Sequence, residues 1–114
     1  DEISIADKTD VAELKDGMVR RFSIQPEEFG ISRTPIDTIK AADSADSLRM
    51  IRSVLDNQPG PARDIVQLNA GAAIYTTGLA KTLAEGMDRA DKAIASGEAR
   101  NRLDRLIILT QGFE

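Results

Sequence analysis

The hydrophobic and polar positions of this chain follow two different patterns, and one replaces the other near residue 42. Residues 1–42 contain all of the strand-like alternation, whereas residues 43–114 are rich in Ala and Leu at helical spacing. The pattern predicts an α/β chain in which the end of a strand and a β-hairpin are followed by an extended connector and about four α-helices.

A β-hairpin is the clearest local prediction. Asp16-Gly17 supplies the positive φ angles that a two-residue type I′ turn requires, and residues 11–15 and 18–24 flank it. Upstream, Ile3-Ser4-Ile5 has the pattern of a strand end whose beginning is missing. Because an isolated hairpin is marginally stable in water, we expect it to pack on another element.

A helical turn and then longer helices are expected after the hairpin. Pro26–Phe29 predicts the turn, Gly30 ends it, and residues 31–42 form the connector. The helices are expected from about 44 to 56, from Pro61 to near Thr76, from Thr82 to Gly97, and from about 98 to 110. Asp43 or Ser44 caps the first, and Thr82-Leu83-Ala84-Glu85 matches a capping box in which Glu85 reaches back to the start of the helix.

Each helix has an apolar face that is expected to point inward. The second helix is apolar or small on nearly all sides, which predicts that it is the most buried element. The expected inward residues are Leu48, Ile51 and Leu55 in the first helix, with Met50 and Val54 beside them, Leu83, Met87, Ala90 and Ile94 in the third, and Leu103, Leu106, Ile107 and Thr110 in the fourth.

Composition excludes several classes of chemistry. The chain has 114 residues, enough for one domain or a piece of a larger one, and its net charge of −4 argues against nucleic acid as the main partner. It contains no Cys and no His, which excludes disulfides, thiolate zinc sites, imidazole bases and Ser-His-Asp triads. Carboxylates, lysines, arginines and hydroxyls remain, together with any hard metal ion that carboxylates hold.

The ends of the chain suggest a piece of a cytoplasmic protein. No apolar run approaches the roughly 18 residues that span a bilayer, and Asp1-Glu2 is not the start of a secretory leader. The first residue is not Met, and the strand end at residues 3–5 suggests that other residues precede Asp1.

Few residues stand out as candidates for chemistry. Asp1 and Glu2 are adjacent carboxylates, which at an exposed terminus are usually only solvated; in a regular strand they would point to opposite faces. Asn69, within the apolar helix, is more simply a buried amide that bonds to nearby backbone than a functional group. Three glycines within or between the expected helices match neither a dinucleotide-binding nor a Walker motif; they are Gly71, Gly78 and Gly86.

Several motifs together resemble the closing segment of anthranilate phosphoribosyltransferases, over essentially all of the chain. The family patterns D-x-x-x-L-N-A-A, S-L-x-E-G and A-I-x-S-G are similar to residues 64–75, 83–86 and 93–97. Asp1-Glu2-Ile3-Ser4 resembles the end of the family segment D-G-L-D-E-I-S. Residues 11–14 and 26–30 follow in the expected order.

The resemblance implies a fold, a reaction and a metal site. Members of this family transfer phosphoribosyl from phosphoribosyl pyrophosphate (PRPP) to anthranilate, with release of pyrophosphate, in tryptophan biosynthesis. The chain would be the C-terminal part of their large α/β domain, and the parent enzyme a homodimer. The family's Asp-Glu pair binds Mg²⁺, which places the metal ligands at Asp1 and Glu2; no catalytic residue is expected within this chain.

Some family features are absent, and two other functions stay open. The glycine-rich phosphate loop, the K-H-G-N segment and the N-terminal helical domain that forms the dimer do not occur in these residues, so the chain alone is not expected to catalyse. Ala41-Ala42-Asp43 and Ser47 also depart from the family pattern. The alternatives are a piece of a related enzyme of the pyrimidine nucleoside phosphorylase type and a stand-alone interaction module whose hairpin adds to a partner's sheet.

Overall fold

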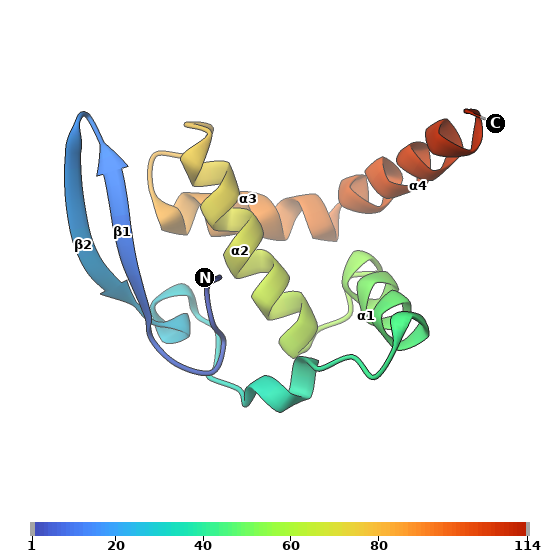
Figure 1. Cartoon of the computed structure of the whole chain (residues 1–114), viewed down its shortest axis with the longest axis horizontal. Coiled ribbons are helices and arrows are strands. Elements are labelled where there is room, and N and C mark those ends of the chain that lie inside the picture. Colours follow the sequence, from blue (N-terminus) through green and yellow to red (C-terminus); the bar gives the residue numbers. More distant parts are fainter. Residues whose placement is uncertain (1, 114) are drawn as a thin grey trace.

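The computed structural model describes residues 2–113, and it confirms a hairpin followed by helices (Figure 1). In chain order the elements are β1 Thr9–Lys15, β2 Met18–Ile24, the 3₁₀ turns η1 Pro26–Phe29 and η2 Ile36–Ile39, and the helices α1 Ser44–Leu55, α2 Pro61–Thr76, α3 Leu83–Ala95 and α4 Glu98–Gln111. No helix in this described part is both long and apolar enough to cross a membrane.

The hairpin forms with the predicted turn. β1 and β2 pair antiparallel, with Thr9 opposite Ile24 and Lys15 opposite Met18. Asp16 and Gly17 have φ angles of 52° and 76°, as a type I′ turn requires. Burial on the hairpin is confined to its open end, where Ile24 is buried, while the residues next to the turn are exposed.

The caps predicted for the helices are confirmed with one difference. The carboxylate of Asp43 accepts the backbone N–H of Asp46 at 2.8 Å, and the hydroxyl of Thr82 accepts that of Glu85 at 3.1 Å. Glu85, however, accepts the N–H of Lys81 at 2.8 Å, one residue earlier than a capping box specifies.

The crossing of α2 over α3 forms the centre of the molecule. Leu68 of α2 and Met87 of α3 are buried together with Ile5 and Ile31 from the first part of the chain. α2 has few exposed residues, as expected, but α3 has more buried residues, and among them Met87, Ala90 and Ile94 follow the predicted stripe. At the crossing Gly71 faces Gly86, and a Cβ on Gly86 would lie 2.2 Å from the carbonyl oxygen of Gly71.

One expectation about the first part of the chain is wrong, and another stays a prediction. The connector is not extended throughout, because Pro35 and the residues after it form the turn η2, in which the N–H of Thr38 donates to the carbonyl of Pro35. Residues 3–5 pair with no strand within residues 2–113, and their backbone groups bond to side chains and to the connector. The strand end expected there stays a prediction.

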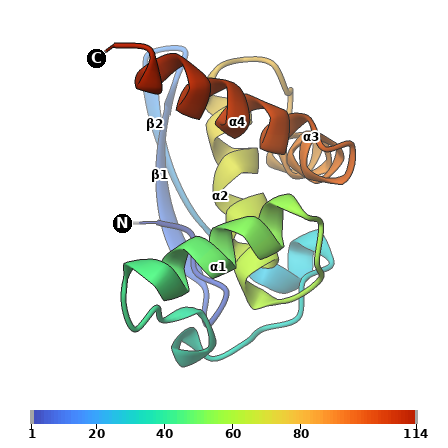
Figure 2. The same ribbon diagram turned by 90° about the vertical axis from the view of Figure 1, so that its right-hand side faces the viewer.

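The apolar faces predicted for α1 and α4 are largely exposed. Leu48 and Ile51 of α1 are 44% and 46% exposed, and Val54 is the residue of that helix that is buried. In α4, Leu106 and Ile107 are 54% and 44% exposed. α4 extends away from α3 on the side opposite the hairpin, as Figures 1 and 2 show. The radius of gyration is accordingly 15.5 Å, above the ~13 Å of a compact domain of this length.

Candidate metal-binding site

Glu2 lies at the edge of a cleft between the hairpin and α2. Its side chain is exposed and contributes to the lining of the cleft, whose volume is about 580 Å³. The other walls come from β1, the last turns of α2 and the loop that leads to α3. This volume falls within the range of small-molecule sites, about 300–1,000 Å³. Asp1, the other predicted metal ligand, lies outside the described residues.

The backbone next to Glu2 is held by the side chain of Asn69. The N–H of Ile3 donates to Oδ1 of Asn69 at 2.9 Å, and Nδ2 of Asn69 donates to the carbonyl of Ile3 at 3.0 Å. Nδ2 also donates to the carbonyl of Ile65, one turn earlier in α2, at 3.0 Å. This confirms the interpretation of Asn69 as an amide bonded to backbone, and it shows which backbone: the residue after Glu2.

The next two residues are fixed by other elements. The N–H of Ser4 donates to the hydroxyl of Thr9, at the start of β1, at 3.0 Å. The carbonyl of Ile5 accepts the N–H of Thr34, in the connector, at 2.9 Å, and its side chain is fully buried. Residues 3–5 are therefore attached in turn to α2, to β1 and to the connector.

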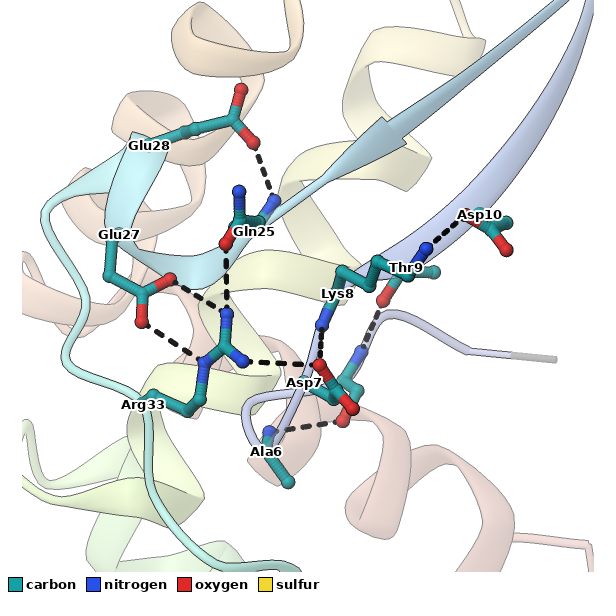
Figure 3. Close-up of polar contacts among 10 residues, drawn as sticks. Ala6, Asp7, Lys8, Thr9, Asp10, Gln25, Glu27, Glu28 and Arg33 are labelled. Carbon is teal, nitrogen blue, oxygen red and sulfur yellow. Dashed lines mark hydrogen bonds and ion pairs between the residues drawn. The ribbon is translucent and has the colours of Figure 1, made fainter.

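Arg33 joins the loop after this segment to η1 (Figure 3). Its guanidinium donates to Oδ1 of Asp7 at 3.1 Å, to Oε1 of Glu27 at 3.1 Å and to Oε1 of Gln25 at 2.9 Å. The backbone N–H of Glu27 and then Arg33 lower the pKa of the Glu27 carboxyl. The group is mostly exposed, so we assign it a modest part in holding the loop.

The hairpin is attached to α2 near its turn. The hydroxyl of Tyr75 donates to the carboxylate of Glu13, which Arg20 on β2 also contacts at 2.9 Å. The hydrogen bond from Tyr75, followed by the contact with Arg20, lowers the pKa of the Glu13 carboxyl. Nζ of Lys15 lies 5.7 Å from the centre of the Tyr75 ring. Glu13, Lys15 and Tyr75 line the same cleft as Glu2 and Ile3.

The chemistry of Glu2 fits a hard divalent cation. Within residues 2–113 no three carboxylates gather closely enough to hold a metal ion by themselves. Mg²⁺ in proteins is often bound by only one or two carboxylates and completes its octahedral shell with water and substrate phosphates. An exposed carboxylate on an anchored backbone, beside a cleft of substrate size, is consistent with that mode of binding.

Sequence reasoning did not identify Thr9, Arg33 and Tyr75. Tyr75 is the only tyrosine of the chain, in a helix otherwise apolar at that end, and a buried phenol usually finds a hydrogen-bond partner. That signal could have indicated a contact with the hairpin, which was expected to pack on another element. No comparable signal marks Thr9 or Arg33, because their partners are set by the path of the loop between residues 3 and 9.

Comparisons with known proteins support the resemblance. Residues 1–100 match the model of a family described as glycosyl transferase family, a/b domain. The anthranilate phosphoribosyltransferase of Nitrosospira multiformis is 51% identical over 107 residues, 94% of this chain and 31% of the relative. The enzyme of the same name from Thioalkalivibrio sulfidiphilus is 54% identical over 110 residues, 96% of this chain and 32% of the relative. The chain thus spans about a third of the length of these relatives.

Solved structures agree with the fold. A crystal structure of anthranilate phosphoribosyltransferase from Thermus thermophilus matches with a TM-score of 0.82 and 33% identity, over 92% of this chain and 31% of that one. The Saccharomyces cerevisiae enzyme, in complex with 4-fluoroanthranilate, matches with a TM-score of 0.88 and 21% identity over 99% of this chain and 33% of that one. The predicted α/β fold class is confirmed by both.

Proposed function

We propose a function for this chain, which belongs to the glycosyl transferase family (a/b domain): it is part of an anthranilate phosphoribosyltransferase and contributes ligands for that enzyme's divalent cation. The observation that carries the proposal is the identity of about half of all positions, over nearly the whole chain, with relatives of that name. The reaction would join C1 of the ribose of PRPP to the amine of anthranilate, break the bond from C1 to pyrophosphate and release a proton from the amine.

Glu2, with Asp1, is the metal-binding element in this proposal. The cation, Mg²⁺, would neutralise the charge that develops on the departing pyrophosphate. The chain's own part is to present carboxylate oxygens at the edge of the cleft. The exposure of Glu2, and the attachment of the next residue to α2, support this role. A displacement at an anomeric carbon depends on positioning and charge stabilisation, so the absence of Cys and His does not argue against it.

The remaining parts of the proposal come from the relatives and the resemblance. PRPP and anthranilate would be the substrates, and the phosphate-binding loops and the anthranilate contacts would lie in the rest of the enzyme. The yeast relative was solved in complex with 4-fluoroanthranilate, which supports an aromatic amine as acceptor. A homodimeric, cytoplasmic enzyme in tryptophan biosynthesis completes the proposal.

The test uses the enzyme that contains this chain, with loss of anthranilate fluorescence as the measure of turnover. Glu2→Gln keeps the shape of the side chain and removes its charge, so we expect the Mg²⁺ concentration for half-maximal rate to rise by about tenfold or more. Asp104→Asn is the matched control, since it removes an exposed carboxylate from α4 instead. Its Mg²⁺ dependence should equal that of the wild type.

Two results would contradict the proposal. If the wild-type enzyme forms no product from PRPP and anthranilate but cleaves a pyrimidine nucleoside with phosphate, the alternative of the nucleoside phosphorylase type is correct. If the enzyme makes the product and Glu2→Gln responds to Mg²⁺ as the wild type does, the reaction stands but Glu2 has no metal role.

A further inference from the structure

Asn69 is bound to Ile3, the residue that follows Glu2 in the chain. Both hydrogen-bonding groups of the Ile3 backbone are used by the same side chain, the N–H at 2.9 Å and the carbonyl at 3.0 Å. A side chain that accepts from the N–H and donates to the carbonyl of one residue holds the two peptide groups on either side of that residue, here the one that joins it to Glu2 and the one that joins it to Ser4. In Figure 1 the first described residues accordingly lie beside the middle of α2.

We propose that Asn69 is a positioning residue for the metal site: by clamping the Ile3 backbone to α2, it holds the Glu2 carboxylate where a divalent cation can use it. The inference rests on the proposed function, since it assigns a role in the same site. It does not make Asn69 a ligand. Its amide oxygen and nitrogen are occupied by Ile3 and Ile65.

The position of Asn69 in the helix supports this role. α2 is built of small and apolar residues around it, and Asn is a weak helix former because its amide competes with backbone hydrogen bonds. Here one N–H of the amide donates to the carbonyl of Ile65, which keeps the side chain in place within α2, and the rest of the amide reaches across to Ile3. The helix thus provides a rigid support for the clamp.

The hydrogen bonds also predict which residues are affected when the Asn69 amide is removed. Ser4 and Ile5 keep their bonds to Thr9 and Thr34 when the Asn69 amide is removed. Without the amide, the backbone of Ile3 would lose both of its hydrogen bonds to α2, and Ser4 would be the first residue after Glu2 that is still bonded to another element. Metal ligands lose affinity when their supporting hydrogen bonds are lost, typically by about 10–100-fold.

The test is Asn69→Ala in the enzyme that contains this chain. Mn²⁺ binding is measured by electron paramagnetic resonance, and Mg²⁺ dependence by turnover. We expect Mn²⁺ to bind about tenfold more weakly and the half-maximal Mg²⁺ concentration to rise in parallel. At saturating Mg²⁺ the maximal rate should stay close to that of the wild type. Hydrogen exchange should accelerate at the Ile3 amide and remain slow within α3.

Gln67→Met is the matched control. Gln67 is another amide of α2, and it bonds to the carbonyl of Met87 at 3.3 Å and to Arg63 at 3.1 Å rather than to the start of the chain. Its loss should change stability and leave the metal constants unaltered. Thr9→Val gives a second approach that leaves α2 intact, and we expect a smaller rise in the Mg²⁺ requirement because Ser4 lies one residue further from Glu2.

These outcomes distinguish a failure of this inference from a failure of the proposed function on which it rests. If Glu2→Gln weakens Mn²⁺ binding but Asn69→Ala leaves it unchanged, Asn69 only stabilises the fold and the inference is wrong. If Asn69→Ala does not fold, Asn69→Asp replaces it, since it keeps the shape of the side chain and cannot donate to the carbonyl of Ile3; unchanged Mn²⁺ binding in that variant overturns the inference equally. If neither Glu2→Gln nor Asn69→Ala alters Mn²⁺ binding, the metal role of Glu2 itself has failed.

Discussion

Gly86→Ala is expected to be strongly destabilising, although Ala is the better helix former. The added Cβ would lie 2.2 Å from the carbonyl oxygen of Gly71 and 3.0 Å from its carbonyl carbon, where ordinary contacts begin at 3.4 Å. Both atoms belong to the backbone of α2, so no side-chain rotation relieves the clash. The helices must separate by roughly 1 Å, and a gap of that size forfeits a quarter to a half of each dispersion contact that it opens.

The magnitude follows from two opposing terms. Overpacking of this kind costs about 1–3 kcal/mol, and the upper end applies because Leu68 of α2 and Met87 of α3 belong to the same buried core. Lost contacts between these side chains add to that cost, while the change from Gly to Ala in a helix returns about 1 kcal/mol. The net loss is about 2–3 kcal/mol. At about 2 °C per kcal/mol it lowers the unfolding midpoint by about 4–6 °C.

Scanning calorimetry of the enzyme that contains this chain measures the shift, and Gly112→Ala is the control. Gly112 has a negative φ of −81°, and a Cβ there would lie 3.4 Å from its nearest neighbour, an ordinary contact. Its substitution should move the midpoint by no more than about 1 °C, the effect of a neutral surface change. A midpoint for Gly86→Ala equal to or above that of the wild type would refute the claim that the two backbones touch at this crossing.

Two further predictions concern the hairpin and the exposed helix α4. Tyr75→Phe removes the hydrogen bond that most lowers the pKa of Glu13. A lowered pKa stabilises the folded state at pH values above the ordinary pKa of 4.5. The variant should therefore be less stable than the wild type at pH 7, and the difference should shrink as the pH falls below 4.5. A difference in stability that does not depend on pH would contradict this. The 114-residue chain by itself should bind a hydrophobic dye and unfold over a broad temperature range. The reason is the exposure of apolar side chains: Leu106, Ile108 and Phe113 are 54%, 71% and 78% exposed. A sharp unfolding transition without dye binding would contradict this prediction.

Signals that act between near neighbours in the sequence predicted the structure well. Asp16-Gly17 specifies its turn through its own φ angles, and Asp43 and Thr82 cap helices through N–H groups three residues away. The apolar stripe of α3 was also correct, because it lies against α2, the preceding helix in the chain. Each of these features is decided within a short stretch of chain.

Contacts between distant residues explain what the sequence did not reveal. The Asn69 side chain binds a residue 66 positions away, which no local pattern indicates. The stripe of α1 was assigned to Leu48 and Ile51 from helical spacing, but the side of the helix that is covered depends on where α2 lies, and it is Val54 that is buried. The metal site itself was inferred from the resemblance, since adjacent carboxylates alone do not distinguish a metal site from a solvated terminus.

α2 therefore links the stability of the molecule to its candidate metal-binding site. Gly71, which touches α3, and Asn69, which holds Ile3, are two residues apart in α2. The two positions face different neighbours because each helical residue is rotated by about 100° from the one before it. α2 can thus pack closely on α3 with one side and support the start of the chain with another. A polar side chain in an apolar helix costs little free energy of folding when its hydrogen bonds are made. Asn69 makes them with the backbone of Ile3, next to Glu2, which pairs with no strand within residues 2–113.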